Sequence, residues 1–303
     1  MSVVKKIKEF ISKIGAIHNR IIDESEVQKV LIGNLLAGQI KQKGIVKDFS
    51  EIEFKVFSQW GDDGIIQYLI QNIDIPYKTF IEFGVESYIE ANTRFLLLND
   101  NWSGLIMDGS AEHMNSVRKS NIYWRYDLQV KDVFITKPNV NQLIASSGFD
   151  SDLGILHIDI DGNDYWIWKE IDISPIIVIV EYNSLFGFDN SWSTPYSDDF
   201  YRTKHHYSNI CYGSSLLSLC DLAEEKGYDF VGCNSAGNNA YFVRKDKTGD
   251  LNKHTAESGY RLSKFKEGRA KDGSLTYIRD KQRFEQMKGA LVYNTRTNQT
   301  ETL

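Results

Sequence analysis

The pattern of apolar and polar residues changes character along the chain. From Phe54 to Lys245, short β-rich runs alternate with amphipathic stretches. The runs GILHIDID (154–161) and PIIVIVEYN (175–183) are typical of buried strands, and SLLSLCDLAEEKG (215–227) predicts a helix that ends at its glycine. Regular alternation of strands and helices predicts an α/β fold built on a doubly wound, mostly parallel sheet.

Other segments complete the predicted sheet. Two antiparallel strands close enough to form a hairpin are expected in YDFVGCN and NAYFVRKD, joined by SAGN. A weak third strand is expected in either IYWRYDL or DVFIT. The remaining expected elements are the strands KTFIEFG (78–84) and WSGLIMDGS (102–110) and the helices ANTRFLLLNDN (91–101), AEHMNSVRKSN (111–121) and NVNQLIASSG (139–148).

The first fifty residues have the pattern of helices. Two apolar sets each predict a helix there, and the second set, from Val27 to Leu35, predicts one that ends near Gly38. Such helices could pack on the main body, drive self-association or, because lysines flank the first seam, lie on a membrane surface. We expect packing or homo-oligomerisation. The first helix is predicted by a seam with 4-3 spacing: Val3, Ile7, Phe10, Ile14, Ile17 and Ile21.

The segment beyond Asp246 is polar and shows little periodicity, which indicates a peripheral helical cap with a frayed end. The sequence therefore suggests a helical segment at 1–50, a Rossmann-like domain at 51–250 and a cap at 251–303.

Composition excludes several classes of protein. The 303 residues carry a formal net charge of −6, which disfavours nucleic-acid binding because that requires clustered cations. The three cysteines show no CxxC spacing, so a zinc site or a disulfide framework is not expected, and a reducing cytoplasm fits best. No apolar run is long enough for a spanning helix, and the lysine-rich start lacks the apolar core of a signal peptide.

The candidate chemistry lies at the carboxyl ends of the expected strands, where open parallel sheets bind ligands. A dinucleotide site would need G-x-G-x-x-G, but the first turn, EFGVESYIEANT, has Gly84 alone, and Glu82 and Glu86 would repel a phosphate. S-adenosylmethionine is positively charged and suits this turn. Glu82 would neutralise its charge, Gly84 would let the backbone approach, and Asp108 has the position of a ribose-binding acid.

Several segments together resemble class I S-adenosylmethionine-dependent methyltransferases, and most closely the FkbM-like proteins of bacterial surface-polysaccharide gene clusters. The resemblance implies seven strands with the last one antiparallel. The chain departs from the family where a second and third glycine are often found, at Glu86 and Tyr88. The segments are FSQWGDDGIIQYLI (57–70), FIEFGVESYIEANTRFLL (80–97), WSGLIMDGS, HIDIDGNDYWIW (157–168) and VIVEYNSLFG (178–187).

Residues in these segments are candidates for binding S-adenosylmethionine. In SQWGDDG, Asp62 or Asp63 could cap the following helix, or the segment could help to cover the cofactor. The candidate cofactor-binding residues are Gln59, Glu82, Gly84, Asn92, Asp108 and Asp159.

A metal site is also possible. Asp159 and Asp161 are two residues apart, as are Glu181 and Asn183, so each pair would share one face of its strand. Adjacent carboxylates need a cation or a proton, and Mg²⁺, Mn²⁺ or Ca²⁺ would supply the former. By resemblance to some sugar O-methyltransferases, the metal would hold two substrate oxygens and acidify one. Alternatively, Asp159 and Glu181 would bind the cofactor or the substrate without metal.

Five further acid and histidine residues have candidate roles. The insert 184–213 is rich in aromatic residues that suit sugar rings, and its His205 and His206 are candidate general bases unless this is an ordinary surface loop. Asp161 is a further catalytic candidate. His157 is expected to be a hydrogen-bonded core residue, and Asp164 to cap the next helix.

The predicted function is methyl transfer from S-adenosylmethionine to an oxygen of a sugar or sugar-derived acceptor, including a nucleotide sugar or glycan, during surface polysaccharide assembly. One alternative is a metal-dependent glycosyltransferase, in which Asp159-Ile160-Asp161 is a D-x-D motif. Another is a non-catalytic binding protein that oligomerises through its N-terminal helices.

Overall fold

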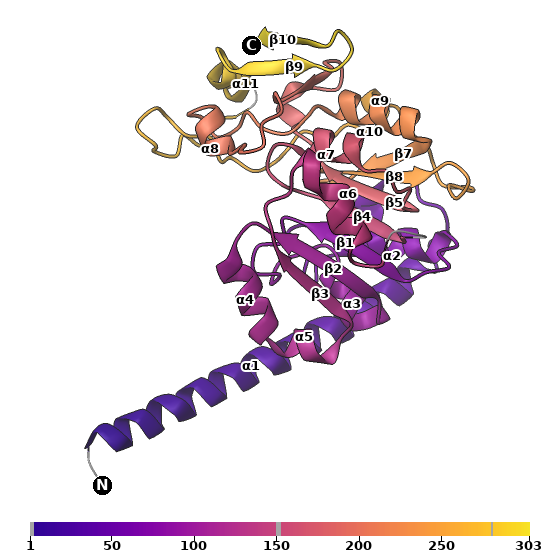
Figure 1. Ribbon diagram of the computed structural model, residues 1–303. Coiled ribbons are helices and arrows are strands. Elements are labelled where there is room, and N and C mark those ends of the chain that lie inside the picture. Colours follow the sequence, from indigo (N-terminus) through magenta and orange to yellow (C-terminus); the bar gives the residue numbers. More distant parts are fainter. Residues whose placement is uncertain (1–2, 150–152, 280) are drawn as a thin grey trace.

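The computed structural model describes residues 3–149, 153–279 and 281–303, so the first two residues of the predicted helical segment lie outside it. Its centre is a seven-stranded sheet in the order β3-β2-β1-β4-β5-β8-β7 (Figure 1). The first five strands are parallel, and β8 is antiparallel to both neighbours. The strands are β1 (Thr79–Phe83), β2 (Ser103–Asp108), β3 (Leu128–Asp132), β4 (Ile155–Ile158), β5 (Ile177–Glu181), β7 (Tyr228–Cys233) and β8 (Asn239–Arg244).

This sheet confirms the predicted fold class, an α/β sheet of seven mostly parallel strands whose last strand is antiparallel. β7 and β8 form the predicted hairpin. The weak third strand lies between the two proposed segments. Every residue of β4 and β5 is buried, which explains why both were visible as continuous apolar runs.

Helices cover both faces of the sheet. One buried apolar cluster joins one face to α2 (Asp62–Asn72), α3 (Arg94–Asp100), α4 (Ala111–Lys119) and α5 (Asn121–Arg125). The other joins the opposite face to α6 (Lys137–Ala145), α7 (Asp164–Glu170), α9 (Leu216–Lys226) and α10 (Ala256–Gly259). This is the layered arrangement of doubly wound folds.

Helix ends follow the sequence signals in part. α9 ends at Gly227, which has a φ of +82°, as the sequence predicts. Asp164 does not cap α7: Asn163 occupies the cap position, and the Asp164 carboxylate accepts the N–H groups of Ile160 and Gly162. It stabilises the turn between β4 and α7 instead.

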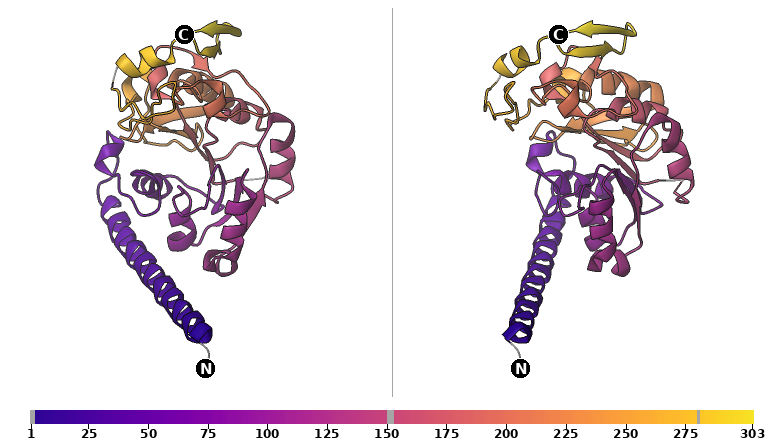
Figure 2. Two further views of the ribbon diagram at one scale, coloured as in Figure 1. Left: turned by 90° about the vertical axis from the view of Figure 1, so that its left-hand side faces the viewer. Right: turned by 60° about the vertical axis from the view of Figure 1, so that its left-hand side comes forward.

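The N-terminal segment is one helix, α1 (Val3–Ile40), rather than two. The polar stretch DESE (23–26) between the two apolar sets contains no proline or glycine, so nothing there interrupts the backbone hydrogen bonds. The C-terminal part of α1 packs on the body, where Gly33, Ala37 and Ile40 are buried, while the N-terminal part projects away from it (Figure 2). Within the described residues, none of the helices has the length and apolar character needed to cross a membrane.

The C-terminal region differs from the predicted helical cap with a frayed end. Besides α10 and α11 (Lys281–Met287), it contains the antiparallel strands β9 (Leu291–Asn294) and β10 (Gln299–Thr302). β9 also pairs with β6 (Trp192–Ser193), which lies in the aromatic insert together with η2 (Ser184–Phe186) and α8 (Arg202–His205). The end of the chain therefore holds the insert in place. A further 3₁₀ helix, η1 (Phe49–Glu51), follows α1.

Candidate functional site

A cavity of about 890 Å³ opens at the carboxyl ends of the parallel strands. This is where an open parallel sheet is expected to bind its ligand, and the volume suits a cofactor together with a small acceptor. Predicted site residues that line the cavity are Gln59, Glu82, Gly84, Asn92, Asp108, Asp159, Asp161 and Glu181. The topology thus gathers most of the acids that the sequence placed at strand ends.

The turn after β1 depends on the close approach of two backbones. Gly84 has a φ of +73°, and a Cβ there would lie 1.6 Å from the carbonyl oxygen of Asp159. The glycine therefore allows β1 and β4 to end side by side. The packing of these two backbones requires a glycine here, whereas the sequence alone suggested backbone contact with a cofactor as the reason. Glu86 and Tyr88 also have positive φ angles, 46° and 57°. The methyltransferases that the sequence resembles often have glycine at these two positions. Glu86 and Tyr88 stand there in this chain, yet both residues adopt the backbone conformation that favours glycine.

Asp108 lies at the end of β2 and fixes the same turn. One carboxylate oxygen accepts the N–H of Glu86 at 2.8 Å, and the other accepts the N–H of Ser110 at 2.7 Å. The side chain is half-buried and lines the cavity. Because each carboxylate oxygen can accept more than one hydrogen bond, Asp108 can still bind ligand hydroxyls.

Glu82 is buried and has its charge paired within the protein. Its carboxylate accepts the N–H groups of Asn92 and Thr93 at 2.8 and 3.0 Å and the Thr93 hydroxyl, and it lies 2.9 Å from Nδ1 of His157. Burial alone would raise the pKa of Glu82, but the hydrogen bond and charge of His157 lower it. Burial alone would lower the pKa of His157, but Glu82 raises it.

This pairing changes the predicted role of Glu82, because His157 already neutralises the carboxylate that was expected to face a ligand cation. His157 is a buried and hydrogen-bonded histidine, as the sequence predicts, but its ring also lines the cavity beside Asn92, which lies 3.1 Å from Nε2. The pair forms part of the cavity wall.

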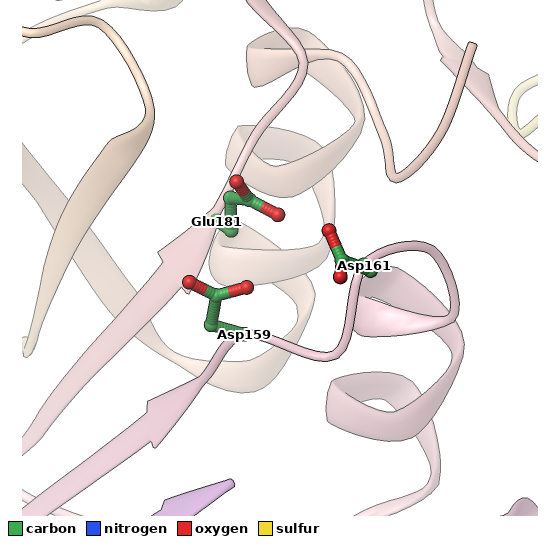
Figure 3. A group of neighbouring side chains, drawn as sticks. All are labelled: Asp159, Asp161 and Glu181. Carbon is green, nitrogen blue, oxygen red and sulfur yellow. The ribbon is translucent and has the colours of Figure 1, made fainter. Parts of the chain in front are cut away.

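Asp159, Asp161 and Glu181 form a second group of acids, whose carboxylates point toward one another (Figure 3). One oxygen from each lies within 4.8 Å of the others. The prediction that Asp161 shares a strand face with Asp159 is wrong, because β4 ends at Ile158; Asp161 joins the group through a turn in which its own φ is +59°. We call these three residues the acidic triad.

The acidic triad is electrostatically strained. Burial and the charge of Asp161 raise the pKa of Asp159 to about 6, and burial together with Asp159 and Asp161 raises the pKa of Glu181. Glu181 is 7% exposed, and its Oε2 atom accepts no hydrogen bond from the described residues. A buried carboxylate oxygen without a donor is costly, so the triad has unused capacity for a cation or a donor group.

Asn183 does not belong to the acidic triad. β5 ends at Glu181, and Asn183 caps η2 by accepting the N–H of Leu185 at 3.0 Å. Its amide also donates to the carbonyl oxygens of Ile210 and Tyr212, at 2.8 and 2.9 Å. The predicted metal-ligand role of Asn183 is therefore wrong for this arrangement, because its side chain is committed to holding the insert.

Arg202 is a cavity residue that the sequence did not reveal. Its guanidinium donates to Asp161 at 2.7 Å and to Glu267 at 2.8 Å, and it lies over the ring of Tyr212. Although burial opposes its charge, Asp161 and Glu267 raise the pKa of Arg202. In the sequence, the only signal for a role of Arg202 was its position in the aromatic insert. Its partner Glu267 could not be recognised, because it is distant in sequence. Arg202 partly neutralises the acidic triad.

The predicted bases His205 and His206 are not among the described residues that line the cavity. Nε2 of His205 lies 3.0 Å from the carbonyl oxygen of Leu291, and Nδ1 of His206 lies 2.7 Å from the Ser208 hydroxyl. Burial lowers both pKa values. The prediction that these histidines lie at the site is wrong. His205 contacts β9 instead, a strand that the sequence did not reveal.

The SQWGDDG segment shapes the cavity wall through Asp63. One of its carboxylate oxygens accepts the N–H groups of Val56, Phe57 and Ser58 at 2.7, 2.9 and 2.8 Å. The loop held in this way leads directly to Gln59 and Trp60, which line the cavity. Neither predicted cap exists, since Gly61 occupies the cap position of α2 without a side-chain hydrogen bond.

No family model matches the chain, and no curated protein matches it. Solved structures with a similar fold include the N-terminal domain of EvdMO1 with SAH bound (10% identity, 70% of this chain and 93% of that chain, TM-score 0.37). Another is the O-methyltransferase from Bacillus cereus in complex with SAH (14% identity, 72% and 91%, TM-score 0.39). The same N-terminal domain of EvdMO1 is also similar in a structure obtained in the presence of SAH and D-fucose (10% identity, 69% of this chain and 94% of that chain, TM-score 0.36). These similarities are too remote to assign an activity to this chain.

Proposed function

We propose that this protein transfers the methyl group of S-adenosylmethionine to a hydroxyl oxygen of a sugar or sugar-derived acceptor. The observation that carries the proposal is the cavity at the strand ends, whose charged side chains are mostly carboxylates. Acids in the wall are Glu82, Glu86, Glu90, Asp108, Asp159, Asp161, Glu181 and Glu267, against the cations Arg202 and Lys266. Such a wall favours a cationic methyl donor and disfavours a phosphate.

The cofactor would lie over the turn after β1 and the end of β2. Asp108 is half-buried and its carboxylate has lone pairs left for ribose hydroxyls. Gln59 and Asn92 line the same part of the wall and offer polar groups to the amino-acid end. Because His157 pairs with Glu82, and Lys55 with Glu90 at 2.8 Å, we assign the attraction of the donor's positive charge to Glu86 and Asp108.

The acceptor would lie beside the acidic triad. Phe200, Tyr201 and Tyr212 line the cavity next to Arg202, and aromatic faces suit sugar rings. In the reaction, the acceptor oxygen attacks the methyl carbon, the bond from that carbon to sulfur breaks, and the hydroxyl proton passes to a triad carboxylate. Asp159, whose pKa is about 6, is suited to accept this proton near neutral pH, in place of His205 or His206.

A divalent cation fits the acidic triad, because carboxylate oxygens are the ligands that Mg²⁺ and Mn²⁺ prefer and Oε2 of Glu181 lacks a donor among the described residues. Asp159, Asp161 and Glu181 would hold it. When bound, such an ion would acidify an acceptor hydroxyl. Arg202 offers a competing positive charge to Asp161, so an ion would have to share this carboxylate with the guanidinium.

The alternative of a metal-dependent glycosyltransferase uses the same acids, with Asp159-Ile160-Asp161 holding the diphosphate of a nucleotide sugar through the ion. That reading assigns no role to Asp108 or to the turn at Glu86. Calorimetry with S-adenosylhomocysteine and with a panel of nucleotide sugars, each with and without Mg²⁺, separates the two readings. Binding of S-adenosylhomocysteine is expected without metal, and binding of nucleotide sugars alone would refute the methyltransferase proposal.

Activity is then tested with S-adenosylmethionine and a panel of sugars and nucleotide sugars, with mass spectrometry of the products. We expect a methylated sugar ether and S-adenosylhomocysteine in equal amounts. We place this activity in the assembly of a bacterial surface polysaccharide and in a reducing cytoplasm, which suits the free cysteines Cys211, Cys220 and Cys233. Release of S-adenosylhomocysteine without a methylated sugar would contradict the acceptor class but not the cofactor.

A further inference from the structure

The projecting part of α1 carries an apolar stripe that the body does not cover. Ile7, Phe10, Ile14, Ile17 and Ile21 are between 51% and 64% exposed. They follow one another at 3- and 4-residue spacing and so lie on one side of the helix. Monomeric proteins rarely leave a continuous apolar stripe of this length in water, which indicates that something else covers it.

The fold points this stripe away from the body. Gly33 and Ala37 are buried against the body, whereas Leu31 and Leu35 are 64% and 65% exposed. Each residue advances a helix by about 100°, so Leu31 and Leu35 lie on the side opposite Gly33. Continued toward the N-terminus, that outer side is the side of Phe10 and Ile17. Figure 2 shows the N-terminal half of α1 clear of the body in both views.

The charge of this part of the helix is opposite to that of the protein. Residues 3–22 contain five lysines or arginines and one acid, Glu9, whereas the whole chain has a net charge of −6. Lys13 and Arg20 are exposed and lie along one edge of the stripe, seven residues apart. Cations beside an apolar stripe are the pattern of helices that lie in the interface of an anionic membrane.

A second copy of the chain fits this surface less well. In a two-stranded coiled coil, residues that flank the seam face flanking residues of the other helix, and acids must meet the cations. In the sequence between residues 3 and 22, the heptad positions next to the seam are occupied on one side by Lys6, Lys13 and Arg20 and on the other by Val4, Ile11 and His18. An antiparallel pair would bring cations together, and a parallel pair would give them no acid.

We propose that α1 binds peripherally to the surface of an anionic phospholipid membrane. Its apolar stripe, from Ile7 to Ile21, would enter the interface, with Lys13 and Arg20 at the headgroups. The helix would lie along the surface rather than cross it, and the α/β body would remain outside the lipid. This inference does not depend on the proposed methyltransferase activity.

The experiment is vesicle flotation of the full chain. Vesicles contain either phosphatidylcholine alone or phosphatidylcholine with phosphatidylglycerol, at low and high salt. The protein is expected to float with the anionic vesicles at low salt and to remain behind in the other three conditions. Each removed cation weakens binding by about fivefold, so Lys13→Ala with Arg20→Ala weakens it by about 25-fold. Ile14→Glu with Ile17→Glu abolishes it.

Asn34→Glu is the matched control, because it adds an acid to an exposed position of α1 away from the stripe and should leave flotation unchanged. Circular dichroism confirms that each variant is folded. If the wild-type chain does not float with anionic vesicles, the proposal is wrong. It is also wrong if light scattering shows a dimer that Ile14→Glu with Ile17→Glu dissociates while vesicles bind neither form, since a second copy then covers the stripe.

Discussion

One cavity holds two buried acids, Glu82 and Glu181, that the protein treats in opposite ways. The Glu82 carboxylate accepts hydrogen bonds from Asn92 and Thr93 and pairs with His157. Glu181 is nearly as buried, yet its Oε2 atom accepts no hydrogen bond from the described residues, and the charges of Asp159 and Asp161 repel it. The pKa is lowered at Glu82 and raised at Glu181.

The difference separates a structural acid, Glu82, from an acid whose hydrogen-bonding capacity is available to a ligand, Glu181. Around Glu82 the protein itself supplies the donors, so the charge stabilises the end of β1 against the following turn. Glu181 is repelled by neighbouring carboxylates and is incompletely hydrogen-bonded, and both lower the free energy of unfolding. Selection for function is the usual reason for keeping such a group.

The largest effect is expected for Glu82→Ala. This change leaves His157 and the N–H groups of Asn92 and Thr93 without their buried partner, and breaking such a pair costs about 3–5 kcal/mol of the free energy of unfolding. Urea denaturation measures the loss. Glu90→Ala is the control, because Glu90 is an exposed acid of the same cavity wall and should change stability by less than about 1 kcal/mol. Equal losses for both variants would show that the buried pairing of Glu82 with His157 does not stabilise the fold.

Glu181→Gln tests the other side of the comparison. Removal of the charge relieves repulsion with Asp159 and Asp161, so the free energy of unfolding should stay equal or rise by about 1 kcal/mol. Methyl transfer should fall by about 100-fold or more, because the triad loses a proton acceptor or an ion ligand. The two readouts are denaturation and initial rates at saturating S-adenosylmethionine. A variant that is both less stable and fully active contradicts the assignment.

Asp108→Ala should weaken binding of S-adenosylhomocysteine by about tenfold, the value of one hydrogen bond to a charged group. Titration calorimetry measures the change. Asp132→Ala is the matched control, since Asp132 ends the neighbouring strand β3 but is not among the described residues lining the cavity. If both variants bind equally well, Asp108 is only a turn residue.

The smallest effect is expected for His205→Gln, which should change the rate of methyl transfer by less than about twofold. His205 contacts the carbonyl oxygen of Leu291 rather than the cavity, and glutamine can keep a hydrogen bond there. Initial rates and the pH profile check this. A tenfold loss of rate with unchanged stability would restore His205 as the base.

The sequence by itself determined the sheet and the acids at its edge. Local patterns were sufficient because a strand buried on both sides is a continuous apolar run and because topology places the carboxyl ends of parallel strands together. β4, β5, the β7–β8 hairpin and the helix stop at Gly227 all follow from such patterns. So does the presence of Glu82, Asp108, Asp159 and Glu181 at the cavity.

Only the tertiary structure decided how each of these acids is satisfied. His157 meets Glu82 from a neighbouring strand, and Arg202 joins Asp161 to Glu267 from another part of the chain. After β5, the side chain of Asn183 binds the backbone of the insert. Because β6 pairs with β9, His205 contacts β9 rather than the cavity. Local periodicity carries no information about partners this far apart in sequence, because backbone conformation fixes the direction of a side chain and the packing of other segments supplies its neighbours.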